Sequence, residues 1–122
     1  MHRTSRKGLR YEDRARLYLQ QRGLRLIEQN FCSRFGEIDL VMLERGAICF
    51  IEVKFRSSLS CGGAAYSIPL SKQRKIVKTA LFYLARQQQH ANRDIRFDAF
   101  LIQRQPDGSD RNEWIRNAFY AE

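Results

Sequence analysis

Two apolar segments separated by three residues constrain this chain more than any other feature of its sequence. Residues 37–43 and 47–55 are rich in Ile, Val, Leu, Met and Phe, and the tetrapeptide Glu44-Arg45-Gly46-Ala47 joins them. This pattern predicts a β-hairpin. A loop of two or four residues centred on Arg45-Gly46 pairs residues whose numbers sum to 91. The expected pairs are Leu43 with Ile48, Val41 with Phe50, Asp39 with Glu52, and Glu37 with Lys54. A three-residue loop would place Asp39 and Glu52 on opposite faces of the sheet.

Side-chain alternation assigns the hairpin residues to two faces. One face is expected to hold Asp39, Val41, Leu43, Ile48, Phe50, Glu52 and Lys54. The other face is expected to hold Ile38, Leu40, Met42, Cys49, Ile51 and Val53. Both faces are largely apolar, so the hairpin is predicted to lie in the middle of a sheet that is covered on both sides.

The expected pairing of Asp39 with Glu52 brings two carboxylates together. Their Cβ atoms would lie about 5 Å apart, and their repulsion at an effective dielectric near 20 would be roughly 3 kcal/mol. A positive group must therefore lie nearby. Two interpretations remain open: a structural ion network formed by Lys54 and an arginine, or a site for Mg²⁺ or Mn²⁺ with Lys54 free to meet a phosphate.

The remaining periodicities predict an α/β protein. Residues 9–22 have helical spacing and end at Gly23, and residues 24–31 are typical of a strand. Residues 56–67 are small and polar and predict a loop. A long helix is expected from Pro69 to about Gln89, with Ser67 or Ser71 as its cap, and then a strand over residues 96–102. After a turn at residues 106–110, residues 114–119 predict a short strand or a helical turn. The order α-β-β-β-α-β indicates an α/β sandwich whose mixed sheet combines an antiparallel hairpin with a crossover to a parallel strand.

Composition favours one basic domain with a polyanionic partner. The chain has 122 residues and a formal charge of +9, with 22 Lys and Arg against 13 Asp and Glu. This surplus points to nucleic acid, and no stretch is apolar enough to span a membrane. Residues 1–8 are basic without the apolar core of a secretory signal, so a flexible N-terminal arm, a domain over 9–122 and a cytoplasmic location are expected. The three cysteines form no CxxC motif, so neither a disulfide framework nor a zinc site is expected.

Several motifs resemble the YraN family of uncharacterised bacterial proteins (UPF0102). They are Glu12-Asp13-x-Ala15-x-x-Tyr18-Leu19-x-x-x-Gly23, Asn30, Gly36-Glu37-Ile38-Asp39-Leu40, Phe50-Ile51-Glu52-Val53-Lys54-x-Arg56, Arg96-Phe97-Asp98 and Asn117-Ala118-Phe119. The series Glu12, Asp39, Glu52-Val53-Lys54 and Gln73 also resembles the restriction-endonuclease-like, or PD-(D/E)xK, nuclease superfamily. The family is distantly similar to archaeal Holliday junction resolvases, which are homodimeric. One departure is Tyr11, which stands where family members usually carry glycine.

The resemblance implies a restriction-endonuclease-like α-β-α sandwich and a Mg²⁺- or Mn²⁺-dependent endonuclease acting on DNA, including branched or repair intermediates. It implies that Asp39, Glu52 and the carbonyl of Val53 bind the metal, while Lys54 activates water and stabilises charge on the phosphate. Glu12 would complete the acidic cluster, and Gln73 would help to place water or phosphate. Structural roles remain as alternatives: Glu12 as a solvated glutamate and Gln73 as a buried amide.

The basic residues near these motifs are the expected contacts to nucleic acid. They are Arg3, Arg6, Lys7, Arg10, Arg56, Lys72 and Lys75. Little in the sequence indicates readout of bases. The alternative function is a catalytically silent module of the same fold that binds nucleic acid or a partner protein, and a homodimer is one arrangement that the resemblance implies.

Overall fold

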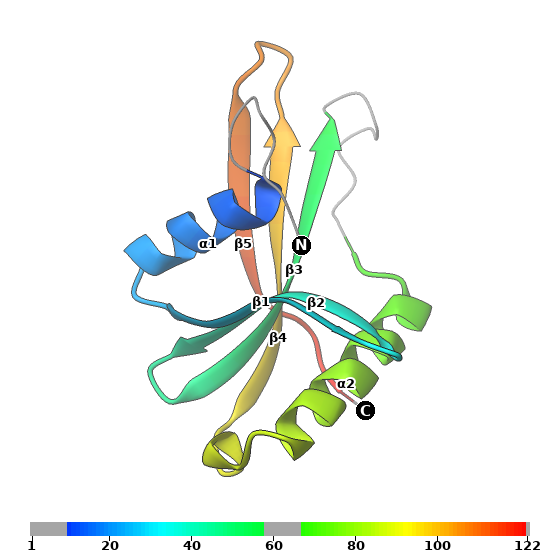
Figure 1. Ribbon diagram of the computed structural model, residues 1–122. Helices are drawn as coiled ribbons and strands as arrows, with labels where there is room; N and C mark the ends of the chain where they lie inside the picture. The colour runs from blue at the N-terminus through cyan, green and yellow to red at the C-terminus, as the bar shows by residue number, and fades with distance from the viewer. Residues whose placement is uncertain (1–9, 58–66, 122) are drawn as a thin grey trace.

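The computed structural model describes residues 10–57 and 67–121, and the predicted arm at residues 1–8 lies outside them. A mixed five-stranded sheet has the order β1-β2-β3-β4-β5, with one helix on each face (Figure 1). The elements are α1 (Tyr11–Gln21), β1 (Arg25–Ser33), β2 (Gly36–Glu44), β3 (Ala47–Ser57), α2 (Leu70–Ala85), the short 3-10 helix η1 (Gln88–His90), β4 (Ile95–Arg104) and β5 (Asp110–Phe119). The α/β class and the mixed sheet are as predicted.

The β2–β3 hairpin has the predicted register. Val41 pairs with Phe50 and Leu43 with Ile48, and the turn is closed by the pair Glu44 and Ala47. The residue with left-handed backbone in this turn is Arg45, at φ 61°. The last ladder pair is Leu40 with Ile51, so Asp39 and Glu52 lie immediately beyond the regular ladder.

The two faces of the sheet carry separate hydrophobic cores. Val41, Ile48 and Phe50 pack on the side of α2, together with Ile76, Ala80 and Tyr83 of this helix. Leu40, Met42, Cys49 and Ile51 pack with Ala15 and Leu19 of α1 on the opposite side. The predicted alternation fails only at Ile38, which packs on the α2 side rather than beside Leu40. Beyond Leu40, where the β2–β3 ladder ends, β2 stays paired with β1, and Ile38 lies opposite Phe31, which packs on the α2 side as well.

Helix α2 forms the predicted crossover, because β4 runs parallel to β3 and pairs Ala99 with Glu52. The helix ends at Ala85, four residues before the predicted end, and η1 follows. Neither predicted serine caps it. Its N-cap is Pro69, which has no side-chain cap bond and whose carbonyl accepts the N–H groups of Lys72 and Gln73.

The C-terminal segment is a ten-residue strand, which decides between the two predicted structures. Strand β5 runs antiparallel to β4 and pairs Phe100 with Trp114. It forms one edge of the sheet, and β1 forms the other. The described helices and strands therefore follow the order α-β-β-β-α-β-β, which has one strand more than the predicted order α-β-β-β-α-β.

Candidate metal and phosphate site

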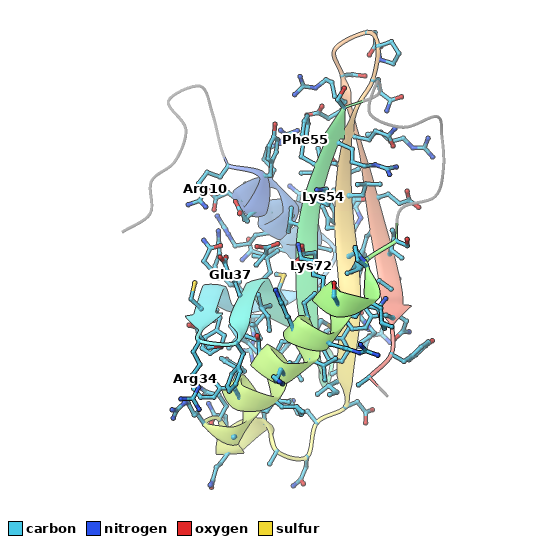
Figure 2. All side chains as sticks on the ribbon, turned by 90° about the vertical axis from the view of Figure 1, so that its right-hand side faces the viewer. Arg10, Arg34, Glu37, Lys54, Phe55 and Lys72 are labelled. Carbon is cyan, nitrogen blue, oxygen red and sulfur yellow. The ribbon has the colours of Figure 1, made fainter. Side chains whose placement is uncertain are left out.

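Asp39 and Glu52 line one cavity at the α2 face of the sheet. The cavity has a volume of about 300 Å³. Its described lining consists of Gly36, Glu37 and Asp39 from β2, Glu52 from β3, and Lys72, Lys75 and Ile76 from α2. The two carboxylates therefore belong to neighbouring strands, and two lysines approach them from the first turns of the helix that covers this face. Figure 2 shows one of these lysines, Lys72, near the start of α2.

The half-buried Asp39 carboxylate is held in place by the next strand. Its Oδ2 accepts a hydrogen bond of 2.7 Å from the backbone N–H of Val53. Burial and the nearby charge of Glu52 raise the pKa of Asp39 from 3.8 to about 7, although the Val53 hydrogen bond opposes this shift. Asp39 is thus an acid that a proton or a cation would stabilise at neutral pH.

Glu52 is buried, with 8% of its surface exposed, and it has a cationic partner. Its Oε2 lies 2.5 Å from Nζ of Lys72. The interpretation of the acid pair as part of a structural ion network required a cation nearby. Lys54 was the lysine predicted for this role, but the structure places Lys72 there. Lys54 is exposed two residues beyond Glu52 on β3 and stands outside the described lining of the cavity.

Glu12 approaches the acid pair from the start of α1. Its charge contributes to the raised pKa of Asp39, and its Oε1 lies 3.4 Å from Nε of Arg10. The departure at Tyr11 does not keep this helix end away from the sheet, because the Tyr11 ring stacks on Phe55 of β3 with centroids 4.4 Å apart.

The other predicted residues lie at several different places. Lys72 and Lys75 line the cavity, whereas the half-buried Gln73 lines a separate pocket and donates its Nε2 to the carbonyl of Ile68 at 2.8 Å. Arg56 is half-buried near the end of β3. Arg3, Arg6 and Lys7 lie outside the described residues.

The acids of the cavity suit a hard cation, although the set is sparse. The carboxylates of Asp39 and Glu52 are oxygen ligands of the kind that Mg²⁺ and Mn²⁺ prefer. The raised pKa of Asp39 shows that its negative charge is incompletely compensated. Within residues 10–57 and 67–121, no three His, Cys, Asp or Glu side chains are grouped so that they could hold a metal ion. An ion at this place would need water or phosphate oxygens to complete its shell.

Comparison with known proteins decides the family of the chain. A model of the uncharacterised protein family UPF0102 matches residues 11–102, which include the whole described lining of the cavity. The chain belongs to this family. A UPF0102 protein of Vibrio campbellii is 46% identical over 112 residues, covering 91% of this chain and 89% of the relative. A UPF0102 protein of Nitrosomonas europaea is 46% identical over 121 residues, covering 98% of each chain. The resemblance to the YraN family (UPF0102) is therefore confirmed.

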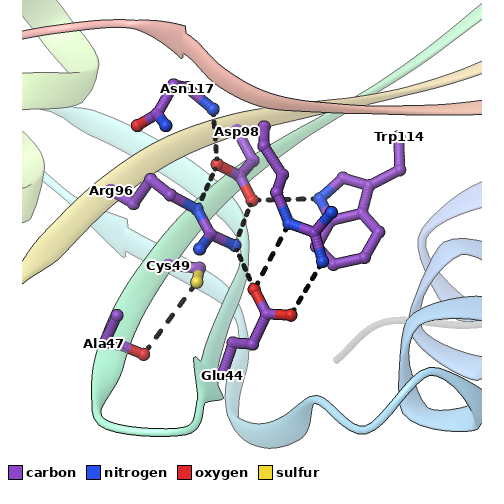
Figure 3. A network of polar contacts seen from close by, with 8 residues as sticks. Glu44, Ala47, Cys49, Arg96, Asp98, Trp114 and Asn117 are labelled. Carbon is purple, nitrogen blue, oxygen red and sulfur yellow. Dashed lines mark hydrogen bonds and ion pairs between the residues drawn. The ribbon is translucent and has the colours of Figure 1, made fainter.

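A buried polar network outside the cavity was missed in this UPF0102 sequence (Figure 3). Asp98, which is 1% exposed, accepts hydrogen bonds from Nε and Nη2 of Arg96, both at 2.9 Å. It also accepts from Nε1 of Trp114 and the N–H of Asn117, both at 3.0 Å. Glu44 joins the network through Arg96 and Arg116, both at 2.8 Å. An acid within the apolar run Phe97-Asp98-Ala99 was the available signal.

The contacts of Asp98 join β4 to β5, and those of Glu44 extend the connection to the end of β2. The network therefore connects the end of β2 with β4 and β5.

No helix in the described part of the chain is long and apolar enough to cross a membrane.

Proposed function

We propose that this UPF0102 chain is a metal-dependent endonuclease that hydrolyses DNA phosphodiester bonds, with branched or repair intermediates as substrates. The observation that carries the proposal is the shared cavity of Asp39 and Glu52. The two acids are close enough for the charge of Glu52 to raise the pKa of Asp39. Perturbed acids that converge in a cavity are typical of functional sites.

The arrangement of the elements supports a restriction-endonuclease-like fold. The acids lie on the two strands of an antiparallel hairpin, the crossover helix α2 leads to a parallel strand, and α1 brings Glu12 from the opposite face. These are the positions that the PD-(D/E)xK resemblance assigns to an acidic cluster.

Asp39 and Glu52 would hold the ion, with the carbonyl of Val53 as a further ligand. A bound divalent ion lowers the pKa of its water and offsets the charge of the phosphate. The backbone N–H of Val53, on strand β3, holds Oδ2 of Asp39 in place. The other carboxylate oxygen, Oδ1, would bind the ion. Lys54, exposed beyond Glu52 on the same strand, would stabilise charge on the phosphate.

Basic residues around the cavity support a polyanionic substrate. Lys72 and Lys75 line it, Arg10 lies beside Glu12, and the whole chain carries a formal charge of +9. Positive charge around a site for a cation attracts a phosphate backbone to the point where it can be cleaved.

The second candidate is a catalytically silent module of the same fold that binds nucleic acid. The ion pair between Lys72 and Glu52 favours it, because a lysine already compensates one of the two acids. The absence of a group of three metal-binding side chains among the described residues favours it as well.

The deciding experiment is cleavage by the purified protein of linear duplex, single-stranded, flap and four-way junction DNA, with Mg²⁺, Mn²⁺ or EDTA. We expect metal-dependent cleavage that Glu52→Gln abolishes while DNA affinity is kept. Glu113→Gln, on the outer strand β5, removes the same charge from an exposed position and serves as the matched control. Equal cleavage by Glu52→Gln and the native chain would rule out the assigned site. Calorimetry that detects no Mn²⁺ binding, together with no cleavage, would favour the silent module.

A further inference from the structure

A cluster of aromatic rings and cations lies where the β1–β2 turn meets α2. Phe35 stands in the two-residue turn, and Phe82 of α2 packs against it with ring centroids 5.6 Å apart. Cζ of Arg34 lies 5.0 Å, and Nζ of Lys78 5.9 Å, from the centroid of the Phe35 ring. Arg86 lies 4.3 Å from the centroid of Phe82. We call these five residues the turn–helix patch.

The patch is continuous with the acidic cavity. Gly36, the next residue after Phe35, lines the cavity and approaches Thr79 of α2 so closely that a Cβ on it would lie 3.2 Å from the Thr79 hydroxyl. Figure 2 shows Arg34 on the outer side of the β1–β2 turn, which lies beside α2, and Lys72 near the start of this helix.

Helix α2 connects the cavity and the patch through one row of side chains. The row consists of Lys72, Lys75, Lys78 and Phe82 of the helix and Arg86, the residue that caps its C-terminal end. Steps of three or four residues keep these side chains on one side of a helix. At 1.5 Å per residue the row extends about 21 Å, the length of several nucleotides of a single strand.

The row has the charge that a phosphate backbone requires. Helix α2 spans Leu70–Ala85 and contains no Asp or Glu, whereas Lys72, Arg74, Lys75 and Lys78 are exposed on it. Lys78 and Arg34 are exposed beside a half-buried aromatic ring. Aromatic faces interleaved with cations are the combination that binds unpaired nucleic acid, because rings stack on bases while cations contact phosphates.

We propose that the turn–helix patch binds an unpaired nucleic-acid strand and guides it along α2 to the acidic cavity. An unpaired base stacks on the Phe35 ring in place of the Arg34 guanidinium, which turns to a phosphate, and Lys78 and Arg86 contact the phosphates on either side. A base inside a duplex has no free face for such stacking, so the patch selects single-stranded segments, flaps or open junctions. The inference deepens the proposed function and rests on it for the partner being a nucleic acid.

The test is the affinity of the full chain for a fluorescent 20-nucleotide dT strand and for a 20-base-pair duplex, measured by anisotropy in EDTA so that no cleavage occurs. Phe35→Leu keeps an apolar side chain and removes the aromatic face, whereas Phe35→Tyr keeps the ring. We expect Phe35→Leu to weaken binding of the single strand by about fivefold or more, with a smaller effect on the duplex. Phe35→Tyr should bind like the native chain. Tyr120→Leu, at a residue 71% exposed and outside the patch, is the aromatic control.

Charge variants test the phosphate contacts. Lys78→Ala should reduce the slope of log affinity against log salt for the single strand by about 0.7, the value of one phosphate contact. Arg111→Ala, on the outer strand, should leave the slope unchanged. Thermal melting followed by circular dichroism verifies that each variant is folded, and Arg34→Ala, in the exposed turn, provides a second patch variant.

Three results would overturn the inference: single-strand affinity unchanged in folded Phe35→Leu, equal losses for single strand and duplex, or polyglutamate competing with dT as well as an unlabelled strand does. The last result would identify the patch as a site for acidic proteins. Because the assay needs no metal, a protein that cleaves no DNA but shows the Phe35 effect would refute the proposed nuclease and support the patch.

Discussion

The ammonium nitrogen of Lys72 lies 2.5 Å from Oε2 of Glu52, in the cavity that Asp39 also lines. A cation from the crossover helix is therefore already paired with a carboxylate that the proposed metal would need. The same ammonium lowers the pKa of Asp39, although burial and the charge of Glu52 outweigh it. Lys72 and a divalent ion are expected to compete for the acid pair.

Replacing Lys72 should therefore strengthen metal binding. Lys72→Met removes the competing charge and keeps an apolar stem. Partly exposed ion pairs contribute about 1 kcal/mol, so we expect Mn²⁺ affinity to rise by about fivefold, measured by isothermal titration calorimetry. Lys75→Met is the control: Lys75 lines the same cavity but forms no described ion pair with Glu52. This variant should raise Mn²⁺ affinity less than Lys72→Met does. Equal or weaker Mn²⁺ binding by Lys72→Met would contradict competition.

A second prediction concerns Lys54, which the sequence singled out and the structure leaves exposed on β3. If its ammonium acts on the phosphate, Lys54→Met should lower the cleavage rate at saturating Mg²⁺ by about 100-fold or more. Mn²⁺ affinity should change little, because the acids remain. Single-turnover cleavage and calorimetry separate the two effects. A native rate in Lys54→Met would assign the phosphate contact to another cation, for which Lys72 and Lys75 are the candidates.

The hairpin shows how far local sequence determines the site. The register depends on a short turn and on alternation within two adjacent strands, so Val41–Phe50 and Leu43–Ile48 could be predicted from sequence alone. The parallel crossover follows from the general rule for strand, helix and strand. The hairpin register places Asp39 and Glu52 next to each other on neighbouring strands before any side-chain geometry is known, whereas the cavity that they line is seen only in the structure.

Contacts between distant segments could not be predicted in this way. The partner of Glu52 is Lys72, 20 residues later, and its choice depends on how α2 lies across the sheet. Phe35 and Phe82 meet for the same reason across 47 residues. Ile38 was assigned to the wrong face because the alternation of the β2–β3 hairpin was extended past Leu40, where that ladder ends, whereas Ile38 pairs with Phe31 of β1.

A third prediction concerns the stability supplied by Asp98. This buried carboxylate accepts four hydrogen bonds, and its loss would leave the Arg96 guanidinium without its main partner. We expect Asp98→Ala to lower the free energy of unfolding by about 3–5 kcal/mol, measured by urea denaturation. Arg116→Ala removes a half-exposed ion pair of the same network and should cost less than about 1 kcal/mol. Similar values for the two variants would contradict the central role of Asp98.

The raised pKa of Asp39 predicts how stability depends on pH. This carboxyl has a pKa of about 7 in the folded chain, against 3.8 in the unfolded chain. Between these values the folded state keeps a proton that the unfolded state has released, so the contribution of Asp39 becomes less favourable as pH rises from about 4 to about 7. The whole penalty, on the order of a few kcal/mol, is present above pH 7.

Asp39→Asn removes this ionisation and keeps a carbonyl oxygen that can accept the Val53 N–H. The native chain should therefore lose stability relative to Asp39→Asn as pH rises from 4.5 to 7.5, in urea denaturation with EDTA. Asp107→Asn is the control. The Ser109 hydroxyl lowers the pKa of the exposed Asp107, so the native chain should not lose stability relative to the Asp107→Asn variant as pH rises. Saturating Mn²⁺ should remove the penalty, since the ion replaces the proton as the positive partner of Asp39. A difference between native and Asp39→Asn that does not change with pH would show that Asp39 is already ionised without a metal.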